Sequence, residues 1–152
     1  MGLRDDFNAA LKAAMLGKDQ PTVDAIRLIN AKLKDADIAA RPKDALDDAA
    51  ILSLLQGMVK SRRESIELYQ KGGRTELAAK EQGEIDVISR FLPQQMTEAE
   101  AKVAIKAIIA ETGATSVKDM GKIMGVLKGK YAGQLDFSQA GNWVKELLGQ
   151  AA

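Results

Sequence analysis

Lysine and glycine recur at short intervals between Lys118 and Lys130, near the C-terminal end of the chain. If this stretch is a helix with 100° between residues, Lys118, Gly121, Lys122 and Gly125 fall on one side, and the apolar residues Met120, Ile123, Met124 and Leu127 fall on the other. Glycines would let a sugar–phosphate backbone approach the main chain, while lysine ammonium groups neutralise its charge. The candidate RNA-binding residues are therefore Lys118, Gly121, Lys122, Gly125, Lys128 and Lys130.

The glycines of this stretch also have an explanation that involves no nucleic acid. Each glycine inside a helix costs roughly 1 kcal/mol of helix stability relative to alanine, so several of them require a reason. Close packing of a neighbouring helix would serve equally well, although flanking lysines such as Lys122 disfavour deep burial of that side. The alternative function is accordingly a protein-interaction module that docks a helical partner or a second copy of itself.

A second group of basic residues lies upstream, where residues 60–74 hold five basic and two acidic side chains. These arginines could meet phosphate groups. Glu64 and Glu67 can instead pair with them, which favours a solvated surface. The candidate secondary basic patch consists of Arg62, Arg63 and Arg74.

The sequence supplies no recognisable catalytic or metal site. It has neither histidine nor cysteine, so it lacks the side chain that titrates near neutral pH and every thiolate. The carboxylates Glu81, Glu84 and Asp86 lie among basic residues, a mixture typical of a solvated helix surface. The stretch GVLKGKY at 125–131 lacks the Ser or Thr with which a phosphate loop holds magnesium. We therefore expect no catalytic residues, no metal and no cofactor.

Composition bears on location as well. The formal net charge is only +1, so any attraction to nucleic acid must be local. Residues 1–7 include Arg4, Asp5 and Asp6 where a secretion signal needs an apolar run, and no stretch is long enough to span a bilayer. The absence of cysteine suits a reducing compartment. These features predict a cytoplasmic protein with no membrane partner.

The elements that must position these residues are predicted to be helices throughout. Aromatic and β-branched residues are sparse, and apolar residues recur at three- and four-residue steps from end to end. Four apolar patterns precede Pro93, and the longest of them runs from about Asp47 to Lys71. The sequence therefore predicts an all-α fold that begins with a four-helix domain over residues 1–92.

A small three-helix domain is expected over residues 97–149. Thr97 and Glu100 have the spacing of a capping box, so a fifth helix should begin there and end at Gly113. A sixth helix should begin at Ser116 and reach about Lys128, and a seventh should be closed by Gly149. The apolar spacing of that last helix includes Trp143, which favours a core position over a ligand-binding one.

Several stretches of the chain resemble the GatB/YqeY family. The C-terminal ones, ETGATSVKDMGKIMGVLKGK at 111–130 and VKELL at 144–148, look like the family's C-terminal domain. Three upstream ones resemble stand-alone YqeY-like proteins in the same order, so that the resemblance covers nearly the whole chain. They are AIRLINAKLKD at 25–35, KSRRESIELYQKGGR at 60–74 and FLPQQMTEAE at 91–100.

The resemblance implies a non-catalytic accessory module that binds tRNA or another structured RNA. In the tRNA-dependent amidotransferase, a glutamine-dependent carbon–nitrogen ligase, a similar domain at the tail of the GatB polypeptide contacts the outer part of the tRNA. The resemblance carries Lys118, Gly121, Lys122 and Gly125 over as candidate tRNA contacts. The glutaminase and phosphorylating sites of the amidotransferase lie outside the shared segment, so it implies no catalysis by this chain alone.

We expect the purified protein to show neither glutaminase nor ATPase activity, because the chain lacks histidine, cysteine and a complete phosphate loop. Ammonia release from glutamine and phosphate release from ATP measure the two activities. Turnover that co-purifies with the chain and disappears when one of its own residues is mutated would contradict this prediction.

Overall fold

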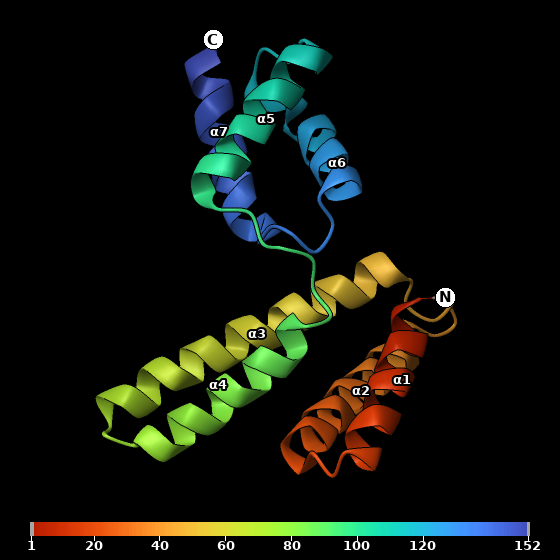
Figure 1. Cartoon of the computed structure of the whole chain (residues 1–152). Helices are drawn as coiled ribbons and strands as arrows, with labels where there is room; N and C mark the ends of the chain where they lie inside the picture. The colour runs from red at the N-terminus through yellow and green to blue at the C-terminus, as the bar shows by residue number, and fades with distance from the viewer. Residues whose placement is uncertain (1, 152) are drawn as a thin grey trace. The chain divides into compact units, whose positions relative to one another are not determined.

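The chain is helical throughout. The computed structural model describes residues 2–151, with side chains for residues 2–149. Within this range the regular elements are seven α-helices and one short 3₁₀ helix, which confirms the predicted all-α fold. The helices belong to two compact units (Figure 1), an N-terminal unit that ends at Pro93 and a C-terminal unit that begins at Gln94.

The N-terminal unit consists of two helical hairpins. Its helices are α1 (Leu3–Leu16), α2 (Gln20–Ala40), α3 (Asp48–Lys71) and α4 (Thr75–Ser89). Asp19 and Asp47 accept hydrogen bonds from first-turn amides of α2 and α3, which explains where these helices begin. Helix α1 packs along α2, and α3 packs along α4 (Figure 1).

Apolar side chains from all four helices form the core of this unit. Phe7 of α1 meets Phe91 edge to face, with 4.8 Å between the ring centroids. Burial of one side of each helix holds the hairpins together. The largest side chains with at most 1% exposure are Phe7, Ile26, Ile29, Ile51, Leu55 and Ile88.

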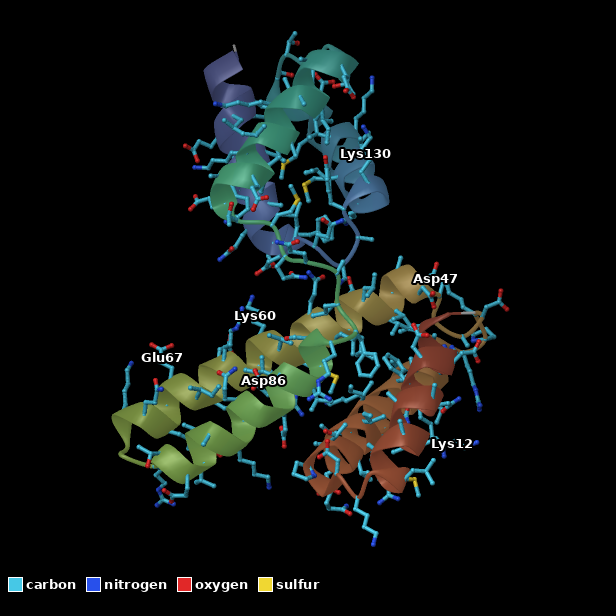
Figure 2. The ribbon with its side chains drawn as sticks, in the orientation of Figure 1. Lys12, Asp47, Lys60, Glu67, Asp86 and Lys130 are labelled. Atoms are coloured by element: carbon cyan, nitrogen blue, oxygen red, sulfur yellow. The ribbon has the colours of Figure 1, made fainter. Side chains whose placement is uncertain are left out.

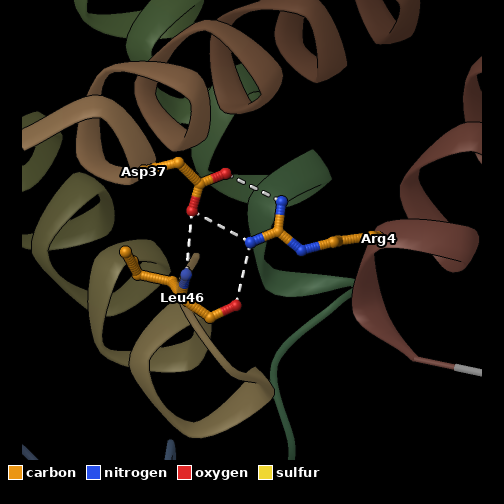
Figure 3. A network of polar contacts seen from close by, with 3 residues as sticks. All are labelled: Arg4, Asp37 and Leu46. Atoms are coloured by element: carbon orange, nitrogen blue, oxygen red, sulfur yellow. Dashed lines mark hydrogen bonds and ion pairs between the residues drawn. The ribbon is translucent and has the colours of Figure 1, made fainter. Parts of the chain in front are cut away.

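A polar network joins α1, α2 and the segment before α3 (Figure 3). The Arg4 guanidinium donates to both carboxylate oxygens of Asp37, at 2.9 and 3.0 Å, and to the Leu46 carbonyl oxygen at 2.8 Å. The Leu46 amide donates to Asp37 at 2.9 Å. The guanidinium and this amide hold the pKa of the Asp37 carboxyl below its ordinary value. Because the Arg4–Asp37 pair is bidentate, it fixes the relative geometry of α1 and α2 in addition to pairing two opposite charges.

The C-terminal unit contains the predicted capping box. Its helices are α5 (Glu98–Thr112), α6 (Met120–Lys130) and α7 (Phe137–Ala151), with the 3₁₀ helix at Val117–Asp119. The Thr97 hydroxyl accepts from the Glu100 amide and the Glu100 carboxylate from the Thr97 amide, both at 3.1 Å. Gly113 follows α5 with a φ of 69°, a left-handed angle that glycine adopts at little cost.

Three helices contribute to the core of this unit. Trp143 packs against that core and is partly buried, as its spacing predicted. The residues at its centre are Ile105 of α5, Ile123 and Leu127 of α6, and Val144 and Leu148 of α7.

One predicted helix boundary is confirmed and two helix ends differ from the prediction: Ser116 is the N-cap of the helical stretch that begins at Val117. The sixth helix begins as a 3₁₀ turn, becomes α-helical only at Met120 and continues to Lys130. The last helix runs through Gly149 to Ala151. Gly149 does not adopt the left-handed angle of Gly113, and a glycine at ordinary helical angles costs only about 1 kcal/mol, too little to end a helix.

Replacing Thr97 with alanine should destabilise the C-terminal unit by about 1 kcal/mol, because the Glu100 amide loses its acceptor. Trp143 is the only tryptophan and packs in this unit, so its fluorescence during urea unfolding measures the change. Thr115→Ala is the control, since Thr115 contributes an amide rather than its hydroxyl to the bond with Asp119. Equal urea midpoints for T97A and the wild type would overturn this account of the helix start.

Asp37→Asn should lower stability at neutral pH, and the difference should shrink in acid. The folded-state pKa of Asp37 lies below the ordinary 3.8, so the stabilisation is present above 3.8 and is lost as pH falls through the folded value. Urea midpoints of the two proteins should therefore differ most near neutral pH, and the difference should shrink progressively as the pH falls below 3.8. Partial exposure of the pair keeps the effect modest. Asp35→Asn, at an exposed position of α2, is the control, and a pH-independent difference would contradict the assignment.

Candidate nucleic-acid interface

The apolar side of α6 decides which of its residues reach solvent. Ile123 and Leu127 are completely buried in the core that α6 shares with α5 and α7. Their burial sets the rotation of the helix about its axis, so the opposite side faces outward. The exposed residues of α6 are Gly121, Lys122, Gly125, Lys128, Gly129 and Lys130.

Gly121, Gly125 and Gly129, here called the glycine face, are open. A Cβ atom added at any of the three would meet no atom of another element within 4 Å. No helix among the described residues packs on the glycine face, so packing inside this chain does not explain these glycines. The close contact between α6 and α7 uses a different glycine, because a Cβ on Gly141 would lie 3.4 Å from Met120 Cε.

Lys122 and Lys128 flank the glycine face. At 100° per residue, each lies about 60° around the helix from Gly125, on opposite sides. Both side chains are exposed, and neither makes an ion pair with a residue that the structure describes. The interface therefore combines an open main chain with unpaired positive charge on both of its borders.

The other two candidate lysines are placed differently. Lys130, the last residue of α6, is labelled in Figure 2. At 100° per residue it lies about 140° around the helix from Gly125. Its ammonium is 3.6 Å from the Glu111 carboxylate of α5, and both side chains are more than half exposed. Lys118 lies in the 3₁₀ turn that precedes α6. The step of 100° per residue holds only for an α-helix, so it does not give the direction of Lys118 relative to Gly125. Its side chain is exposed, and its amide donates to the Ser116 hydroxyl at 3.3 Å.

Arg62 of the candidate secondary patch is turned toward α4. Its Nε donates to the Glu84 carboxylate at 2.8 Å and lies 3.9 Å from Glu81. Its Nη1 donates to the Met58 carbonyl oxygen at 3.2 Å. With 15% of its side chain exposed, Arg62 links the two helices of the hairpin rather than standing free.

Arg62 pairs with carboxylates of α4 instead of the acidic residues next to it in sequence, Glu64 and Glu67. Glu67 lies 3.5 Å from Lys71, one turn further along α3. A partner on α4 is available to Arg62 because the hairpin brings the two helices side by side, which spacing along α3 cannot reveal. Arg63 and Arg74 are exposed.

Acidic side chains and helix composition bear on two other kinds of function in the part of the chain that the structure describes. No group of three or more Asp or Glu side chains there is placed to hold a metal ion. No helix there combines the length and the apolar character needed to cross a membrane.

A groove between α2 and α3 was not foreseen from the sequence. The nearest signal is the four-residue spacing of Ser53, Gly57 and Ser61, which places three small residues on one side of α3. The groove has a volume of about 370 Å³. It is lined by Lys32, Ser53, Leu54, Gly57, Met58, Ser61 and Arg62.

Curated proteins named "Altered inheritance of mitochondria protein 41, mitochondrial" are similar to this chain. The protein of Pyrenophora tritici-repentis is 31% identical over 148 residues, which cover 94% of this chain and 79% of that protein. The protein of Lachancea thermotolerans is 34% identical over 96 residues, 63% of this chain and 51% of that protein. The corresponding values for Saccharomyces cerevisiae strain YJM789 are 32%, 93 residues, 61% and 50%. The matches thus span about half the length of the two yeast relatives.

These relatives overturn the predicted cytoplasmic location, because their names place them in mitochondria. The residues at positions 1–7 argued only against an apolar secretion signal. The absence of cysteine is not specific to one reducing compartment. The composition of a folded domain does not determine its subcellular location, because import into mitochondria is directed by a separate targeting segment.

The family comparison covers almost the whole chain. A family model described as "Yqey-like protein" matches residues 4–148, a range that reaches from α1 into α7. This match confirms the resemblance carried by the motifs at 25–35, 60–74, 91–100 and 111–130. The chain belongs to the YqeY-like protein family.

Proposed function

We propose that this protein is a non-catalytic accessory module that binds tRNA or another structured RNA through the glycine face and its flanking lysines. The observation that carries the proposal is the open space over Gly121, Gly125 and Gly129. An RNA backbone can approach the main chain of α6 there without displacing any described side chain.

Charge supports the same interpretation. The eleven residues of α6 include three lysines and no acidic residue, whereas the whole chain has a net charge of only +1. A local excess of this kind attracts a polyanion through release of its counterions. Lys122 and Lys128 would contact phosphates on the two borders of the glycine face.

The aromatic residues favour a structured RNA over an extended single strand. Proteins that hold single strands stack the bases on accessible aromatic side chains. None of the Phe, Tyr and Trp side chains of this chain is exposed, and Tyr131 and Trp143 pack against the core of the C-terminal unit. Double-helical RNA is instead recognised through its backbone and shape, which matches a surface of glycine and lysine.

A tRNA is the first RNA to test because of the resemblance to the amidotransferase tail domain. The proposed role is accessory, because the resemblance covers the tail domain of the amidotransferase and leaves out its glutaminase and phosphorylating sites. The rival role is docking of a helical partner or of a second copy, for which the glycine face also offers close approach. Burial of that face under a protein would require desolvation of Lys122 and Lys128, which favours RNA.

Replacing Lys122 and Lys128 with glutamate should weaken tRNA binding without unfolding the protein, because both side chains are exposed and unpaired in the described structure. With three or four phosphate contacts, log affinity should fall with log salt concentration at a slope of roughly −2 to −4. The double variant should flatten that slope by roughly 1.5 units. Fluorescence anisotropy of labelled tRNA over a salt series measures both effects.

The matched control for this experiment is Lys145→Glu, which makes the same charge change at an exposed position of α7. It should alter the salt slope far less than the double variant. If Lys145→Glu weakens binding as much, or if the wild-type protein shows no salt-dependent binding at low ionic strength, α6 is not the RNA interface.

Gly125→Leu tests whether Gly125 is needed for binding or only for the structure of α6. Because Gly125 is open, leucine should fit and raise helix stability by up to about 0.8 kcal/mol, while its side chain blocks an approaching backbone. We expect weaker tRNA binding at an unchanged or higher melting temperature. The control is Gly149→Leu, another open glycine of the same unit. Unchanged tRNA binding by Gly125→Leu, with loss of self-association in sedimentation, would favour the docking role.

A further inference from the structure

The groove between α2 and α3 lies within the N-terminal unit and contains none of the α6 residues. Its volume of about 370 Å³ falls in the range of small-molecule sites, about 300–1,000 Å³. Gly57 keeps it open, because a Cβ atom added there would meet no atom of another element within 4 Å. The space is therefore available to a ligand without movement of the helices.

Arg62 is one of the residues that line this groove, and hydrogen bonds hold its guanidinium group in place. Its Nε is bound to Glu84 and its Nη1 to the Met58 carbonyl oxygen, at 2.8 and 3.2 Å. A guanidinium has five N–H donors. Both donors of Nη2 and one of Nη1 make no hydrogen bond with a residue that the structure describes. Because Glu84 already holds the side chain, these donors can bind an anion with little further loss of conformational entropy.

The remaining polar groups of the lining are also hydrogen-bond donors. Lys32 is exposed and makes no ion pair with a described residue. Ser53 and Ser61 add hydroxyl groups, and none of the lining residues is acidic. Leu54 and Met58 add apolar surface beside them. This combination suits an anionic group that is attached to an apolar body.

We propose that the groove binds a small phosphate monoester with an apolar substituent. Lys32 would neutralise charge on the phosphate, the remaining N–H groups of Arg62 and the two serine hydroxyls would donate to it, and the substituent would lie on Leu54 and Met58. A phosphate monoester matches the donors better than a carboxylate does, because three terminal oxygens accept more hydrogen bonds than two. Glu84 and Glu81, at 2.8 and 3.9 Å from Arg62 Nε, offset the charge of Arg62, so Lys32 supplies the electrostatic attraction and Arg62 contributes hydrogen-bond donors.

The test uses NMR of the full chain labelled with ¹⁵N, and the probe is phenyl phosphate. Inorganic phosphate and phenol, which represent the charged and the apolar part of the probe, are the comparison compounds. Phenyl phosphate should produce saturable shifts at the backbone amides of Lys32, Ser53, Gly57 and Ser61, in the millimolar range expected of so small a ligand. Inorganic phosphate should bind at least about threefold more weakly, and phenol should cause no saturable shift at these amides.

Gly57→Leu tests whether the ligand occupies the groove. The leucine side chain would fill the space, and the variant should melt no lower than the wild type because leucine favours helix over glycine. We expect it to abolish the saturable shifts. The matched control is Gly83→Leu, an equally open glycine of α4 outside the groove, which should bind as the wild type does.

Lys32→Gln tests the charge, and Lys34→Gln is its control at an exposed position of the same helix outside the lining. The first variant should raise the dissociation constant of phenyl phosphate about three- to tenfold, and the second should leave it unchanged.

Four results would overturn the proposal. They are an absence of saturable shifts at the groove amides, unchanged binding by Gly57→Leu, equal effects of the Lys32 and Lys34 variants, and equal affinity for inorganic and phenyl phosphate. Shifts of the same amides with tRNA but not with phenyl phosphate would also overturn it, and would assign the groove to RNA. Since α6 is unchanged in every variant, failure here leaves the proposed function of α6 standing.

Discussion

Burial of Ile123 and Leu127 is the constraint on which the proposed interface depends. A helix of eleven residues that contains three glycines has little stability of its own. The glycines cost roughly 3 kcal/mol relative to alanine, whereas full burial of two large aliphatic side chains contributes roughly 3 to 6 kcal/mol. The contacts with α5 and α7 therefore hold α6 in helical form, and they also fix which of its sides faces solvent. The glycine face is exposed because the opposite side is the one that the core requires.

Pairing between helices decides which of the cations present an uncompensated positive charge to a polyanion. Arg4 is bound to Asp37 and Arg62 to Glu84, so both contribute to the assembly of the N-terminal unit. Lys122 and Lys128 have no such partner among the described residues. In a chain whose basic and acidic residues nearly balance, this difference matters more than total charge, because only unpaired cations present a positive surface to a polyanion.

The two units offer different kinds of surface. The C-terminal unit presents an open main chain bordered by lysines, which suits the repeating backbone of a nucleic acid. The N-terminal unit holds a groove with a fixed guanidinium and an apolar wall, which suits one small anion. Both surfaces rely on a helical glycine that nothing covers, Gly125 in one unit and Gly57 in the other. Absence of a side chain is what leaves the main chain of α6 accessible and the groove on α3 open.

The sequence by itself determined the helices, because apolar spacing and capping residues act locally. Thr97 and Glu100 form their capping box from residues three apart, and Gly113 takes the left-handed angle that ends α5. The family could also be identified from the sequence, since the motifs are contiguous. The prediction from the sequence that α7 ends at Gly149 is wrong, because a glycine permits a helix to end but does not force it to end. Only the tertiary structure decided that the glycine face is uncovered, that Arg62 pairs across to α4 and that a groove separates α2 from α3. Each of these depends on residues that are distant in sequence and meet only when whole helices pack, which no local pattern encodes.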